Sequence, residues 1–195
     1  MSIKKASETV VKQCLCIQPA EEVLIIVDEK TKGIGEALQA ACLDVGAEAV
    51  LAEITERELN GEEPPHIIAA AMKKAQVVLA PTSKSLSHTR ARRQATAAGA
   101  RIATMPGITE EMMIRTLTGS YQQIADLTNR LTDILTTGSR AQITAPNGTE
   151  REMSIAHRPG CADTGLLCTA GQFGNLPAGE AFIAPREGSG NGVVV

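Results

Sequence analysis

The chain has 195 residues, of which 43% are hydrophobic and 21% are charged, and its formal net charge is -3 at pH 7. These values are ordinary for a globular protein, so they exclude a disordered or fibrous chain. The acidic balance and the scarcity of aromatic side chains (one Tyr, two Phe and no Trp) argue against a nucleic-acid partner, because such proteins need a basic surface and stacking platforms.

Neither a membrane partner nor a secretion signal is expected. The longest apolar runs, residues 23–27 and 67–72, are far shorter than the roughly 20 residues of a spanning helix. Lys12 and Gln13 interrupt any apolar region near the N-terminus. Five scattered cysteines without a CxxC pair are predicted to be reduced thiols: Cys14, Cys16, Cys42, Cys161 and Cys168. We therefore predict a cytoplasmic protein.

Up to about residue 138 the apolar pattern alternates between strand and helix periods. Ser7 is placed to cap a first helix that ends before Pro19. Apolar runs predict strands at residues 23–27, 49–54, 77–79 and 102–105. Helical spacing predicts helices between these strands, at residues 34–45, 65–74 and 89–98. The order predicts an α/β fold with a parallel sheet covered by helices, that is a Rossmann-like domain.

The pattern changes after the fourth strand. Thr109 is expected to cap a short helix, and an amphipathic helix then runs to Gly138. From Gln142 onward, short β-like pieces are separated by turn residues such as Asn147-Gly148. We predict an α/β domain over residues 1–138 and the β-rich start of a second, catalytic domain over residues 139–195. Because so short a β-rich piece cannot easily bury a core alone, we expect the front part of a longer protein.

Three features are candidates for ligand binding, and each also has a structural explanation. Gly33-Ile34-Gly35 opens a helix after the first strand, as in a dinucleotide-binding loop, but Leu38 replaces the third glycine and a tight turn is favoured. Hydroxyl and basic residues at positions 83–93 follow a strand end, where they would hold an anion or form a solvated helix start. The three histidines, His66, His88 and His157, are potential ligands, but they lack metal-ligand spacing and structural or surface positions are favoured for each.

Glu180 lies in a segment, residues 171–185, that is punctuated by glycine and proline and contains both phenylalanines. A carboxylate beside an apolar, strand-like run costs burial energy unless a cation or a hydrogen-bond donor meets it. A single carboxylate does not hold a divalent ion, however. The residues alone therefore leave two alternatives, an incomplete metal site and an exposed turn.

Two segments resemble the aminopeptidase T/S-type metallo-aminopeptidases, especially the bacterial leucyl aminopeptidase branch. The first runs from Ser87-His88-Thr89 and Ala91-Arg92 through residues 99–109. The second, residues 175–185 (NLPAGEAFIAP), looks like that family's signature around its first metal-binding glutamate.

The resemblance implies that Glu180 ligates one of two divalent ions (Zn, Co or Mg), which activate water to hydrolyse the N-terminal bond of a peptide substrate. It also implies a homodimer. The family's other ligands and its catalytic tyrosine lie further along than this chain reaches. We therefore assign no catalytic residue, and we expect the chain alone to be inactive and not to retain the metals.

Two other functions stay open. Ring-cleaving dihydroxypyridine dioxygenases resemble the same scaffold but use a single iron. Alternatively, the chain is a non-catalytic α/β module for binding or oligomerisation, which predicts a stable fold without metal.

Overall fold

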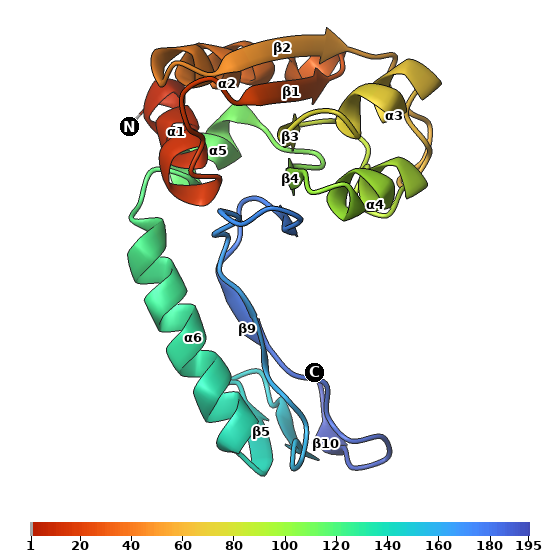
Figure 1. The fold of residues 1–195 in the computed structure, drawn as a ribbon. Helices are drawn as coiled ribbons and strands as arrows, with labels where there is room; N and C mark the ends of the chain where they lie inside the picture. The colour runs from red at the N-terminus through yellow and green to blue at the C-terminus, as the bar shows by residue number, and fades with distance from the viewer. Residues whose placement is uncertain (1) are drawn as a thin grey trace. The chain divides into compact units, whose positions relative to one another are not determined.

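The computed structural model describes residues 2–195, and the contacts within it divide the chain into two compact units (Figure 1). Unit 1 runs up to Gln122 and also includes Gly165–Ala178. Unit 2 contains Gln123–Thr164 and Gly179–Val195. The predicted domain boundary after residue 138 stays a prediction. The compact units differ from it because the chain returns to unit 1 at Gly165.

Unit 1 is built on a five-stranded parallel sheet, which confirms the predicted α/β fold. Its strand order is β2-β1-β3-β4-β8. The strands are β1 (Glu22–Val27), β2 (Glu48–Glu53), β3 (Val77–Ala80), β4 (Arg101–Thr104) and β8 (Phe173–Asn175). All residues of β3 and all but the first of β1 are buried, as expected for strands covered on both faces.

Helices cover both faces of this sheet: α1 (Ile3–Thr9), α2 (Lys32–Asp44), α3 (His66–Met72), α4 (Arg90–Ala97) and α5 (Glu110–Thr116). Helices α3 and α4 pack their apolar residues on one face, against strand residues such as Leu24, Val78 and Ile102. Helix α2 packs on the other face, where Gly35 lies against Val27 and Leu51. None of the helices that the structure describes is long and apolar enough to cross a bilayer.

The helix starts were predicted with mixed success. Thr89 and Thr109 cap α4 and α5, because their hydroxyls accept the backbone N–H groups of Arg92 and Met112. Ser7 is not a cap. The first helix begins at Ile3 and is capped by Ser2, and Ser7 is buried inside it. A five-residue π-helix, η1 (Val10–Cys14), follows α1, and a short 3-10 helix, η2 (Glu29–Thr31), precedes α2.

The edge strand β8 comes from the return segment, residues 165–178, which was predicted to belong to the second domain. Phe173, Gly174 and Asn175 lie opposite Ile102, Ala103 and Thr104 of β4. The Ile102 N–H donates to the Gln172 carbonyl at 2.9 Å, and the Leu176 N–H donates to the Thr104 carbonyl at 2.9 Å. The return segment therefore completes the sheet of unit 1.

The cysteines differ from the prediction of five reduced thiols. Cys16 and Cys168 form a disulfide with a Cα–Cα distance of 5.2 Å, while Cys14, Cys42 and Cys161 are free thiols. Since 152 positions separate the two partners in the sequence, only the return of residues 165–178 to unit 1 brings them together.

Unit 2 contains most of the long helix α6 (Tyr121–Thr137) and two small antiparallel sheets. One sheet has the order β10-β6-β5 and the other pairs β7 with β9. Their strands are β5 (Arg140–Thr144), β6 (Glu150–Ser154), β7 (Cys161–Asp163), β9 (Glu180–Phe182) and β10 (Asn191–Val193). The predicted Asn147-Gly148 turn joins β5 to β6, with the Gly148 N–H donating to the Ala145 carbonyl at 3.1 Å.

Candidate functional site

The carboxyl edge of the parallel sheet contains a crevice where the strand order reverses. The chain leaves β1 for α2 on one face of the sheet and leaves β3 for α4 on the other. Open α/β sheets bind their ligands at such a switch point. A cavity of about 410 Å³ lies here. It is lined by Lys30, Thr31, Gly33, Ile34, Ser83, Gly107, Ile108, Thr109 and Glu110.

A buried carboxylate ties together the two loops below this crevice. Asp28 is 2% exposed and accepts hydrogen bonds from the Ser83 backbone N–H (2.5 Å) and from Ser83 Oγ (2.9 Å). The Thr31 hydroxyl donates to the Pro81 carbonyl at 2.6 Å. These groups satisfy one another and hold the loop after β1 against the loop after β3. The Ser83 hydroxyl and the Asp28 carboxylate are thus engaged in holding the two loops together.

The glycines of the predicted dinucleotide loop have different roles. A Cβ on Gly35 would stand 2.4 Å from Val27 Cγ1 and 2.8 Å from Leu51 Cδ1, so Gly35 allows α2 to pack closely on the sheet. A Cβ on Gly33 would meet nothing within 4 Å. The η2 turn lies between β1 and this glycine pair, so the short phosphate-binding turn of the fingerprint is absent from the described loop.

A second polar network joins the return segment to the sheet. The Ser87 hydroxyl donates to Asn175 Oδ1 at 2.9 Å and lies 2.8 Å from Thr104 Oγ1. Thr104 Oγ1 donates to the same Asn175 oxygen at 2.5 Å. Ser87 and Thr104 are buried, so these bonds fix the end of β8 beside the end of β4.

The basic residues predicted as an anion site are largely engaged within unit 1. Arg92 donates from Nε to the Ser87 carbonyl at 2.7 Å, and its guanidinium lies 4.0 Å from the centre of the Phe173 ring. Burial, and then the charge of Arg93, lower the pKa of Arg92. The Glu63 carboxylate accepts the first backbone N–H groups of α4, from Arg90 (2.5 Å) and Ala91 (3.0 Å). The Glu63 carboxylate thus occupies the N-terminus of α4, where an external anion would otherwise bind.

Glu180, the predicted metal ligand, is exposed at the start of β9. Its register partner on β7 is Asp163, a carboxylate that sequence analysis missed because a three-residue strand leaves no periodic signal. Within residues 2–195 no group of three or more His, Cys, Asp or Glu side chains is arranged to hold a metal ion. The described residues therefore do not fit a complete metal site, and the role of Glu180 stays a prediction.

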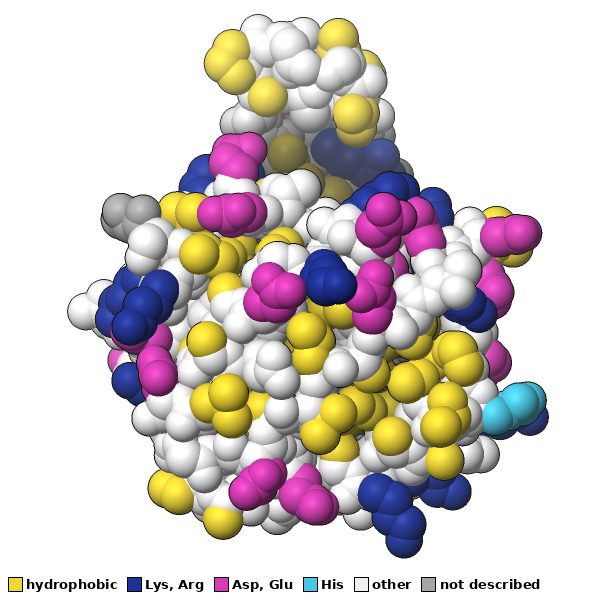
Figure 2. Space-filling model, turned by 90° about the horizontal axis from the view of Figure 1, so that it is seen from above, with side chains coloured by type: hydrophobic (Ala, Val, Ile, Leu, Met, Phe, Trp, Pro, Cys, Tyr) yellow, Lys and Arg dark blue, Asp and Glu magenta, His cyan; other side chains and the backbone are white. Residues whose placement is uncertain are grey.

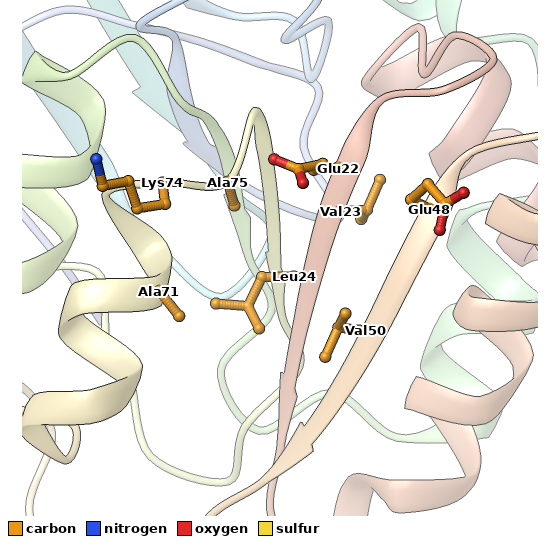
Figure 3. Close-up of a pocket in the computed structure, with 8 residues that line it drawn as sticks. All are labelled: Glu22, Val23, Leu24, Glu48, Val50, Ala71, Lys74 and Ala75. Atoms are coloured by element: carbon orange, nitrogen blue, oxygen red, sulfur yellow. The ribbon is translucent and has the colours of Figure 1, made fainter.

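A further hollow of about 350 Å³ lies at the opposite end of β1 and β2 (Figure 3). Leu24, Val50 and Ala71 give it an apolar floor, and Glu22, Glu48 and Lys74 are charged residues that line it. The face shown in Figure 2 carries acidic and basic side chains interspersed among hydrophobic ones.

The fold and the crevice define a doubly wound α/β unit joined to a small β-rich unit. The sequence profile of 2,5-dihydroxypyridine 5,6-dioxygenase (NicX) matches residues 2–195, and the chain belongs to this family. A search of curated proteins found no match.

Two solved structures share the fold. 2,5-Dihydroxypyridine dioxygenase from Pseudomonas putida KT2440 has a TM-score of 0.73 at 16% identity, covering 96% of this chain and 57% of that one. AmpT from Thermus thermophilus has a TM-score of 0.60 at 15% identity, covering 97% and 63% respectively. This chain thus spans less than two thirds of either protein.

These findings overturn the predicted membership in the aminopeptidase T/S family and, with it, the predicted hydrolase and protease activity. The profile of the dioxygenase family matches the whole described chain, whereas AmpT is a structural match with a lower TM-score. The misleading motifs contain Ser87, Thr104 and Asn175, which bind one another and join β8 to β4. In this chain the residues of these motifs therefore hold the sheet together.

Proposed function

We propose that this chain provides the α/β unit and part of the β-rich unit of a ring-cleaving dioxygenase acting on a dihydroxylated pyridine. The match of the dioxygenase family profile across residues 2–195 carries the proposal. A 5,6-dioxygenase adds both atoms of O₂ to the ring carbons that it separates. The predicted cytoplasmic location and homodimer are part of the same proposal.

A single iron is the metal that we propose for this activity. Non-haem iron oxygenases typically hold the metal with two histidines and one carboxylate. Glu180 and Asp163 are the candidate carboxylates, but no histidine joins them among the described residues. Further ligands would have to come from outside the residues described, so the activity is a proposal for the assembled enzyme.

The direct test is oxygen uptake by the assembled enzyme, which supplies the further ligands, with Fe²⁺ and 2,5-dihydroxypyridine. We expect oxygen uptake to match the loss of the pyridine absorbance, with no release of amino acids from peptides. The Glu180→Gln variant is expected to lose this uptake. The matched control is Glu187→Gln, which changes another exposed carboxylate of unit 2 and should retain the uptake. Uptake that survives in the Glu180 variant would contradict the assignment of this residue.

The second candidate function is a non-catalytic α/β module for binding or oligomerisation. Within residues 2–195 no three His, Cys, Asp or Glu side chains are grouped as metal ligands would be, and this observation favours the non-catalytic module. It predicts that the assembled protein folds but neither binds Fe²⁺ in calorimetry nor consumes oxygen. That result would refute the dioxygenase proposal for this chain and leave the family assignment intact.

A further inference from the structure

The disulfide between Cys16 and Cys168 connects two parts of unit 1 that are remote in sequence. Cys16 follows the π-helix η1, and Cys168 lies in the return segment, five residues before β8 begins. Cys168 is exposed to solvent and Cys16 is partly buried. A thiolate in solution would therefore approach the disulfide from the Cys168 side, and access to one sulfur is the first requirement for thiol–disulfide exchange.

The other thiols of unit 1 do not compete for this exchange. Cys14 and Cys42 are buried, and burial raises the pKa of each thiol to about 12. Both are protonated at neutral pH, and a protonated thiol does not attack a disulfide. Cys161 is a free, exposed thiol in unit 2 and provides a natural control.

Bonds other than the disulfide keep the return segment on the sheet. The Leu167 N–H donates to the Cys14 carbonyl at 2.6 Å, and the Gly171 N–H donates to the Gly99 carbonyl at 3.0 Å. Phe173 and Asn175 are held by Arg92 and by Ser87 with Thr104. Without the disulfide, the stretch around residues 166–171 would depend on single backbone bonds such as those of Leu167 and Gly171. Breaking the disulfide would loosen this stretch without detaching β8, which side-chain contacts also hold.

We propose that Cys16–Cys168 is a reversible exchange site for a dithiol reductant and acts as a redox latch on residues 166–171. A thiolate of the reductant attacks Cys168 Sγ, the Cys16–Cys168 bond breaks, and Cys16 leaves as a thiolate that takes up a proton. The second thiol of the reductant then resolves the mixed disulfide and releases Cys168. Two electrons and two protons pass to the chain, and the reductant becomes a disulfide. In reducing compartments an exposed disulfide of this kind is typically redox-responsive.

The first experiment counts thiols. The chain is purified without reductant, treated natively with or without excess dithiothreitol, quenched with acid, unfolded and alkylated. We expect three labelled cysteines without reductant, which are Cys14, Cys42 and Cys161, and five after native reduction. Five before reduction, or reduction only after unfolding, would overturn the exchange site. Cys161→Ser should lose one label in each sample, and it excludes disulfide scrambling through Cys161.

The second experiment tests the latch by amide hydrogen exchange on the native chain. Reduction should accelerate exchange in residues 166–171 by at least about tenfold and leave β1 and β3 unchanged. The Cys16→Ser/Cys168→Ser double variant should exchange like the reduced chain whether or not dithiothreitol is present. Unchanged exchange at residues 166–171 after complete reduction would show a passive crosslink and refute the latch.

Discussion

The ring of Tyr121 occupies the space that a side chain on Gly165 would need. A Cβ on Gly165 would stand 2.5 Å from Tyr121 Cε1 and 3.2 Å from the Ala178 Cβ, and Gly165 has a φ of +72°. The Tyr121 hydroxyl also accepts the Ala178 N–H at 3.4 Å. Gly165 and Ala178 are the two ends of the return segment, so one buried tyrosine anchors both ends of this segment to unit 1.

Replacing Gly165 with alanine is therefore expected to destabilise unit 1 by about 2–4 kcal/mol, since left-handed backbone strain adds to the clash with the ring. Gly61→Ala is the matched control, because Gly61 has a φ of +82° and open space around it. We expect it to cost only about 1 kcal/mol. The measurement is urea unfolding followed by the fluorescence of Tyr121, which is the sole tyrosine and lies in unit 1. Equal losses in the two variants would exclude the clash.

The two glycines near the start of α2 give opposite predictions. Gly35→Ala should destabilise unit 1 by about 1–3 kcal/mol, because the new methyl group would overlap Val27 and Leu51. Gly33→Ala should stabilise it by about 0.5–1 kcal/mol, because alanine is the better helix former and nothing lies within 4 Å. The urea midpoints of the two variants check this difference in sign. A stabilised Gly35 variant would show that α2 can move away from the sheet at little cost.

The parallel sheet was predictable because β1, β3 and β4 are short apolar runs separated by helical periods. Strand β8 was not predictable, since Phe173-Gly174-Asn175 has no strand pattern and is held by bonds to β4 and to Ser87. The disulfide depends on the same return of the chain. Sequence spacing alone gives no reason to pair Cys16 with Cys168.

The candidate site was predictable only in part. A ligand crevice after a parallel strand follows from the strand order, and Ser83 does line it. The family was misassigned on motifs that contain Ser87 and Asn175. These two residues bind each other and hold the sheet together, and a sequence motif does not distinguish such a structural role from a catalytic one. Asp163 becomes visible only when β7 pairs with β9 and places it opposite Glu180.

Asp28 is expected to be the most costly polar side chain to remove at the crevice. Asp28→Ala would leave the Ser83 N–H and hydroxyl without their acceptor, and should cost about 2–3 kcal/mol. Ser83→Ala keeps the backbone bond and should cost about 1 kcal/mol. Asp44→Ala, at an exposed position on α2, is the control and should change stability by less than about 0.5 kcal/mol. A neutral effect of Asp28→Ala in urea unfolding would show that water replaces the carboxylate.

The Glu21–Arg101 ion pair predicts a specific dependence of stability on pH. Arg101 donates two hydrogen bonds to the Glu21 carboxylate, at 3.0 and 2.6 Å, and the two side chains are 11% (Arg101) and 14% (Glu21) exposed. Burial alone would raise the pKa of Glu21, but the bonds from Arg101 and from the Gln18 N–H, together with the charge of Arg101, outweigh it and lower the pKa below its ordinary value of 4.5.

Because the folded state holds Glu21 at a lowered pKa, the stabilisation is complete above pH 4.5 and is lost as the pH falls through the folded pKa. Wild type should exceed Glu21→Gln by about 1–2 kcal/mol at neutral pH, and the two should converge in acid. The measurement is urea unfolding from neutral pH down through the pKa of Glu21. Glu22→Gln, which changes the exposed neighbouring residue, is the control. A constant difference between wild type and Glu21→Gln at all pH values would mean that the carboxylate contributes through packing rather than through its charge.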